Sequence, residues 1–76
     1  MTIYILTCIN ESSELVSCKP YKNLDMAQAM MRVEAEAEAK DFEDNDRPDY
    51  GYIGDFSAAV GTEDHGYIWN ITEAEL

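Results

Sequence analysis

Apolar side chains occupy both faces of the first strand-like segment of the chain. Residues 2–9 are rich in β-branched and aromatic residues, which are typical of a β-strand. Tyr4 and Leu6 point to one face, and Ile3 and Ile5 point to the other. A strand that is wetted on one side alternates more cleanly with polar residues. The pattern therefore predicts a central strand, or a strand whose outer face meets another chain.

The next residues predict a hairpin. Residues 10–13 have turn-forming side chains, and residues 15–19 form a second short strand that Pro20 ends or marks as a sheet edge. Such a hairpin makes Cys8 and Cys18 candidate cross-strand neighbours. Because no basic and apolar leader precedes the first strand, we expect a cytoplasmic protein whose two cysteines are reduced and half-buried.

A helix is predicted between residues 24 and 40. Asn23 is a favourable N-cap, and Asp25 places an anion in the first turn, where the helix dipole stabilises it. The abundant Ala and Glu residues are good helix formers. Spacings of four, three and four predict an apolar helix face at Met26, Met30, Val33 and Ala37.

The remaining residues predict a loop and two more strands. Residues 40–49 are an acidic loop in which Pro48 blocks helix continuation. Residues 50–60 resemble one strand with an irregularity at Gly54, and residues 67–71 form the last strand before an acidic tail.

The aromatic residues of this second hairpin are expected to build the core, chiefly through Phe56 and Trp69. The order strand, strand, helix, strand, strand predicts an α+β fold of ββαββ type. We expect a four-stranded antiparallel sheet with one helix packed on one face, in a single domain that spans residues 1–76.

Charge narrows the classes of partner. Five Lys and Arg residues face sixteen Asp and Glu residues, which gives a net charge of −11. Direct contact with nucleic acid or with an anionic membrane is therefore not expected, because both need Lys and Arg. The charge favours association with a basic surface. The alternative is that it only keeps the protein in solution.

Half of the acidic residues lie between residues 34 and 49. Glu34 and Glu38 are four residues apart and share a helix face, whereas Glu36 projects to another side. A cationic partner would relieve this repulsion, although a merely solvated surface remains the alternative. The candidate partner-binding residues are Glu34, Glu36, Glu38, Asp41, Glu43, Asp44, Asp46, Asp49, Tyr50 and Tyr52, with Asp55, Glu63 and Asp64 as an extension.

Catalytic and metal-binding patterns are weak, and we expect a protein that is not an enzyme and uses no cofactor. His65 lies in a predicted turn without a partner nucleophile, and Cys8 and Cys18 lie within strands, away from an activating histidine. Residues 41–46 are acidic like a calcium loop, but the glycine required at the sixth position is missing.

The residues 52–58 (YIGDFSA), followed by 67–71 (YIWNI), resemble small proteins carried by phages and mobile elements of gut bacteria. The size and acidity of the chain also resemble phage anti-defence proteins, such as anti-CRISPR inhibitors and DNA-mimic anti-restriction proteins. The second resemblance implies a viral inhibitor whose carboxylates occupy a nucleic-acid-binding surface.

The sequence thus predicts a non-catalytic inhibitor that binds a basic nucleic-acid-binding protein, such as a host defence protein. Two alternatives stay open: a homodimeric structural or assembly module, and a protein that sequesters a small ligand. The two apolar faces of the first strand favour the homodimer.

Overall fold

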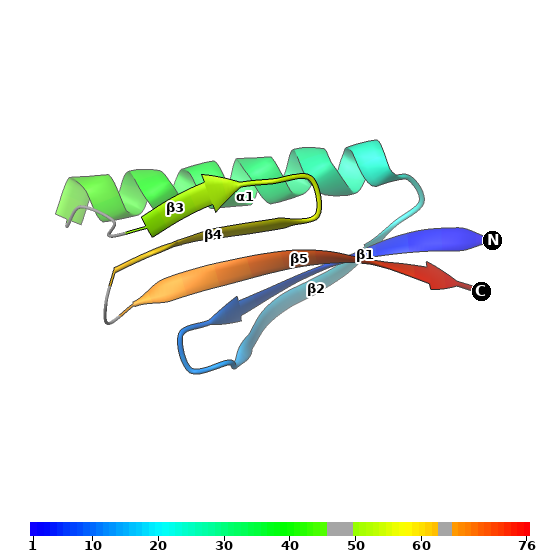
Figure 1. The fold of residues 1–76 in the computed structure, drawn as a ribbon, viewed down its shortest axis with the longest axis horizontal. Coiled ribbons are helices and arrows are strands. Elements are labelled where there is room, and N and C mark those ends of the chain that lie inside the picture. The colour runs from blue at the N-terminus through cyan, green and yellow to red at the C-terminus, as the bar shows by residue number, and fades with distance from the viewer. Residues whose placement is uncertain (46–49, 63–64) are drawn as a thin grey trace.

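The protein is an α+β domain with one helix and one five-stranded antiparallel sheet (Figure 1). The structure is a computed structural model that describes residues 1–45, 50–62 and 65–76. Along the chain the elements are β1 (Thr2–Asn10), β2 (Leu15–Tyr21), α1 (Leu24–Asn45), β3 (Tyr50–Ile53), β4 (Ser57–Gly61) and β5 (Gly66–Glu75).

The sheet has the order β2-β1-β5-β4-β3, so the first and last strands pair at its centre. The helix runs along one face of the sheet (Figure 1). The α+β class, the antiparallel sheet and the central position of β1 confirm the sequence analysis. The number of strands does not, because the sheet has five strands and the sequence predicted four.

The fifth strand arises because residues 50–60 form a hairpin and not one continuous strand. The backbone N–H of Gly54 donates to the carbonyl of Ser57 at 2.8 Å and closes a tight turn between β3 and β4. Glycine and aspartate favour turns, so Gly54 and Asp55 reverse the chain and do not form a bulge. Phe56 follows them at the hairpin end and is 52% exposed, so its predicted place in the core is wrong.

Helix α1 begins as predicted but buries a different face. The side chain of Asn23 accepts a hydrogen bond from the backbone N–H of Met26 at 2.8 Å, which is the geometry of an N-cap. Three of the four positions of the predicted apolar face are wrong, because Met26, Val33 and Ala37 are exposed. Met30 does pack against the core. The helix instead packs small residues and one methionine against the sheet, at Ala27, Met31 and Ala35.

The helix also continues to Asn45, beyond the predicted end at Lys40. Residues 41–45 are acidic but include no proline or glycine, so the chain meets no steric obstacle to helix before Pro48. Residues 41–45, which the sequence predicted to be part of a loop, are therefore helical.

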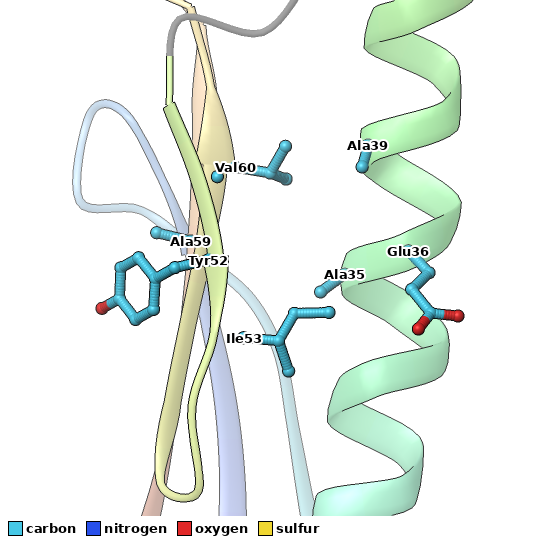
Figure 2. Close-up of a pocket in the computed structure, with 8 residues that line it drawn as sticks. Ala35, Glu36, Ala39, Tyr52, Ile53, Ala59 and Val60 are labelled. Atoms are coloured by element: carbon cyan, nitrogen blue, oxygen red, sulfur yellow. The ribbon is translucent and has the colours of Figure 1, made fainter.

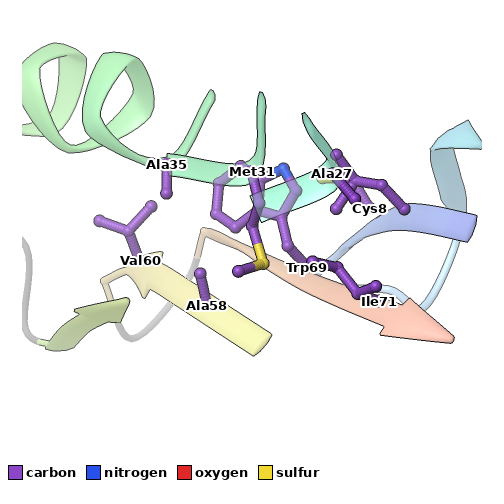
Figure 3. Close-up of a cluster of buried hydrophobic side chains, with 9 residues drawn as sticks. Cys8, Ala27, Met31, Ala35, Ala58, Val60, Trp69 and Ile71 are labelled. Atoms are coloured by element: carbon purple, nitrogen blue, oxygen red, sulfur yellow. The ribbon is translucent and has the colours of Figure 1, made fainter. Parts of the chain in front are cut away.

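The core lies between α1 and the sheet (Figure 3). Trp69 from β5, Leu6 from β1 and Met31 from α1 are its largest fully buried side chains. Tyr67, Trp69 and Ile71 alternate toward the helix, so the predicted place of Trp69 in the core is confirmed. Small helix residues face this sheet because the indole ring fills much of the space between the two layers.

The β1–β2 hairpin places the two cysteines on opposite faces of the sheet. Cys8 pairs with Ser17 and is buried under the helix, whereas Cys18 pairs with Thr7 and is exposed. The prediction that the cysteines are half-buried cross-strand neighbours is therefore wrong. Pro20 lies within β2, which is an edge strand, so of the two readings of Pro20 the sheet edge is confirmed.

Candidate partner-binding surface

Three of the predicted site residues form an acidic stripe along α1. Glu34, Glu38 and Asp41 follow one another at spacings of four and three, which brings them to the same side of the helix. The two glutamates are half-buried and Asp41 is exposed. The last turn of the helix contains no basic residue. Negative charge therefore accumulates toward the C-terminal half of α1.

The Glu34 side chain makes two contacts within the domain. One carboxylate oxygen accepts a hydrogen bond from the Trp69 indole N–H at 3.3 Å, and the other lies 3.3 Å from the Lys19 ammonium on β2. The indole N–H would otherwise be buried without an acceptor. Glu34 therefore ties the helix to β5 and β2, and its charge is partly neutralised inside the protein.

Glu38 is repelled by the neighbouring carboxylates of the acidic stripe. Partial burial raises the pKa of Glu38 above its ordinary value, and the nearby Asp41 and Glu34 carboxylates raise it further. Glu38 in turn is the main cause of a raised pKa of Tyr67, followed by burial and by Glu11. One negative field thus covers the helix stripe and the adjoining strand.

Glu11 joins this field from the turn between β1 and β2. Its carboxylate accepts the backbone N–H of Gly66 at 3.2 Å and lies 3.4 Å from Nδ1 of His65. Its own backbone N–H, then that of Gly66 and finally the imidazole lower the pKa of Glu11, so this group stays ionised. We call Glu11, Glu34, Glu38 and Asp41 the acidic flank.

Glu11 was not among the predicted residues because it lies far in sequence from the other members of the acidic flank. The signal that could have found it is strand pairing. Asn10 pairs with Tyr67 at the end of the β1–β5 ladder, which carries Glu11 to the start of β5. That inference requires knowing that β1 and β5 are neighbours.

The other described members of the predicted site lie elsewhere. Glu36 projects to a different side of α1, as its spacing predicted, and the exposed Tyr52 lies on β3, where its hydroxyl is 3.3 Å from the Ser57 hydroxyl. In Figure 2, Tyr52 points away from the helix. The predicted residues therefore do not form one surface.

The rest of the predicted set is described in part or not at all. The backbone of Glu43 and Asp44 belongs to α1, and the backbone of Tyr50 begins β3. Asp46 and Asp49 lie outside the described residues, as do Glu63 and Asp64 of the extension. Asp55 is exposed in the β3–β4 turn, where its carbonyl accepts a hydrogen bond from the Gln28 side chain at 2.9 Å.

A pocket of about 360 Å³ opens between α1 and the β3–β4 hairpin (Figure 2). Ala35 and Ala39 on the helix face Ile53 and Val60 on the strands, and Glu36 stands at its side. Apart from Glu36, the side chains that face this space are apolar. The pocket therefore has no set of converging polar groups that would orient a polar substrate.

Nucleophilic and metal chemistry find little support in the described residues. Burial, then Glu34 and Glu38, raises the pKa of Cys8 to about 11, which suppresses the reactive thiolate near neutral pH. Within residues 1–45, 50–62 and 65–76, no three His, Cys, Asp or Glu side chains gather as a metal site. The same residues contain no helix that is long and apolar enough to cross a membrane.

No protein-family model, curated protein or solved structure matches this chain. The chemistry of the acidic flank is therefore the basis for assigning a function.

Proposed function

We propose that the protein is a non-catalytic inhibitor whose acidic flank binds a basic, nucleic-acid-binding surface of a partner protein. The observation that carries this proposal is the gathering of Glu34, Glu38 and Asp41 on one side of α1, where burial raises the pKa of Glu38 and the like charges of Asp41 and Glu34 raise it further. Lysine or arginine side chains of a partner would relieve this repulsion and add charge-assisted hydrogen bonds to the carboxylates.

The mechanism is competition for a phosphate-binding channel. Carboxylates on a helix and an adjoining turn present negative charge to the same Lys and Arg residues that otherwise contact the phosphates of nucleic acid. The net charge of −11 speeds the encounter with a cationic channel by long-range attraction. Host defence nucleases, whose channels hold nucleic acid through such residues, are the class of partner that we propose.

The test is a panel of purified restriction and RNA-guided nucleases, each assayed for cleavage with an excess of the protein. We expect at least one nuclease to lose activity, and added nucleic acid to restore it. The double substitution Glu38→Lys and Asp41→Lys should abolish inhibition and reduce the dependence of binding on salt.

A matched control is Glu73→Lys together with Glu75→Lys, which makes the same change of charge on exposed residues near the end of β5. If both double variants weaken inhibition equally, net charge acts and the acidic flank does not. If no nuclease is inhibited by the unaltered protein, the proposed class of partner is wrong.

A further inference from the structure

The face of the sheet opposite the helix bears no charge on any described side chain. Strand pairing defines this open face, which consists of the side chains that alternate with the core residues Leu6, Cys8, Trp69 and Val60. Its described positions hold only Ile, Leu, Ala, Tyr, Thr, Ser, Asn, Cys, Pro and Gly residues. Since 28% of the residues in the chain are charged, the absence of charged side chains from the open face shows that charge is concentrated elsewhere on the molecule.

An apolar row crosses the open face from one edge of the sheet to the other. Each member pairs with the next on the neighbouring strand. Cross-strand neighbours of this kind lie about 5 Å apart, so the row is continuous. From β2 to β3 it consists of Leu15, Ile9, Ile68, Ala59 and Tyr52.

Three of the five members of the row are exposed, whereas Ile9 is half-buried and Ala59 is buried. Leu15, Ile68 and Tyr52 are 65%, 39% and 55% exposed, although Ile68 belongs to a central strand. A second apolar pair, Ile3 and Ile5, lies on the same face of β1. An antiparallel sheet that faces water normally places polar and charged residues outward. This face has the composition of a contact surface.

We propose that the open face binds the open face of a second copy of this chain, to give a symmetric homodimer. Charge identifies the occupant. Two copies that each carry −11 repel one another over most of their surfaces, and the open face is where they can meet without opposing like charges. A strongly cationic partner would instead be drawn to the acidic flank on the other side of the sheet.

The size of the open face also suits a dimer. Five strands spaced about 4.8 Å apart, with an average of about seven residues at 3.4 Å each, cover roughly 600 Å² per copy. Two copies would therefore bury about 1,200 Å² in total, without counting the extra area of protruding side chains. This value reaches the range of stable interfaces. Two sheets would stack about 10 Å apart in an aligned sandwich.

The dimer is independent of the proposed inhibitory function, and salt separates the two. Screening weakens the repulsion between two acidic copies, so dimerisation should strengthen as salt rises, whereas binding of the acidic flank to a basic partner should weaken. A dimer of this form would present two acidic flanks on its outer sides. Failure of one association would leave the other intact.

The experiment is light scattering with size-exclusion chromatography across about 1 µM to 1 mM protein. We expect about 17 kDa, twice the 8.6 kDa of one chain. Ile68→Asp should weaken the dimer about 100-fold or more, because two unpaired carboxylates would be buried at the contact. Val33→Asp is the matched control, since it adds the same charge at an exposed apolar position on the helix.

Ile68→Thr is a milder second variant that keeps a β-branched side chain and should also weaken the dimer. Far-ultraviolet circular dichroism and Trp69 fluorescence report whether each variant is folded. A mass of 8.6 kDa for the unaltered protein at 1 mM would overturn the proposal. So would a dimer that survives both Ile68 substitutions, because that result would assign the contact to a strand edge or to the helix.

Discussion

Replacing Glu34 by alanine should destabilise the fold chiefly through the indole of Trp69. The Glu34 carboxylate is the acceptor for the indole N–H at 3.3 Å, and Trp69 is only 1% exposed. Alanine offers no acceptor. A buried donor that loses its partner retains the cost of leaving water, about 1–3 kcal/mol.

Two smaller contributions adjust this value. The partly exposed pair with Lys19 is worth about 0.2–1 kcal/mol, and its loss adds to the destabilisation. Repulsion between Glu34 and the like charge of Glu38, four residues away, costs about 0.2–0.5 kcal/mol, and the alanine substitution removes this cost. The net loss is about 1–3 kcal/mol. For 76 residues the total free energy of unfolding is about 4–11 kcal/mol, so the change is easily measured.

The assay is urea denaturation followed by the fluorescence of Trp69, the sole tryptophan. With a slope of about 1 kcal/mol per molar urea, Glu34→Ala should lower the midpoint by about 1–3 M. Glu34→Gln is the matched control, because its amide oxygen can still accept the indole N–H. We expect it to stay within about 0.5 kcal/mol of the unaltered protein.

An equal loss in both variants would mean that charge, and not the acceptor, stabilises the fold. A neutral effect of Glu34→Ala would mean that the indole N–H does not depend on this carboxylate. Either result would refute the reasoning.

Three further predictions concern the helix and the cysteines. Glu38→Gln should raise the free energy of unfolding at pH 7 by about 0.5–1 kcal/mol, since it removes repulsion from Glu34 and Asp41. The pKa of Glu38 is raised in the folded state, so the folded protein binds this proton more tightly than the unfolded chain does. The stability of the unaltered protein therefore falls as the pH rises above 4.5. In a denaturation series from pH 4 to 7, the extra stability of the Glu38→Gln variant should vanish at the acid end. Met31→Ala should cost about 2–5 kcal/mol in thermal or urea unfolding, whereas the exposed Met26→Ala should cost less than about 0.5 kcal/mol, and similar losses would contradict the observed helix face. A thiol reagent at pH 7 should label the exposed Cys18 in the native protein and Cys8 only after unfolding, and rapid labelling of both would contradict the burial of Cys8.

Local patterns predicted the elements whose signals do not depend on distant residues. The β-branched residues of β1 and the Asn23 cap identified correct elements, and the last strand was predicted at residues 67–71 within β5. The hairpin at Gly54 was missed because glycine in an apolar run suits a bulge as well as a turn, and pairing with Ser57 decides between them. The helix face was missed because alanine carries little hydrophobic signal, although it fits best opposite a large indole.

The site was predictable only along the helix itself. The spacing of Glu34 and Glu38 follows from helix geometry, but the indole that contacts Glu34 lies 35 positions away in the chain. Glu11 reaches the flank through a contact that spans 55 positions. Contacts of this range depend on the strand order, which a single sequence does not specify.

The pairing of β1 with β5 at the centre of the sheet has a consequence for biosynthesis. Every other strand is made before β5 leaves the ribosome, so the β1–β2 and β3–β4 hairpins emerge without the strand that joins them. Contacts between the ends of a domain form late and slow its folding. Until residues 66–75 emerge from the ribosome, the nascent chain lacks the strand that joins its two hairpins into one sheet.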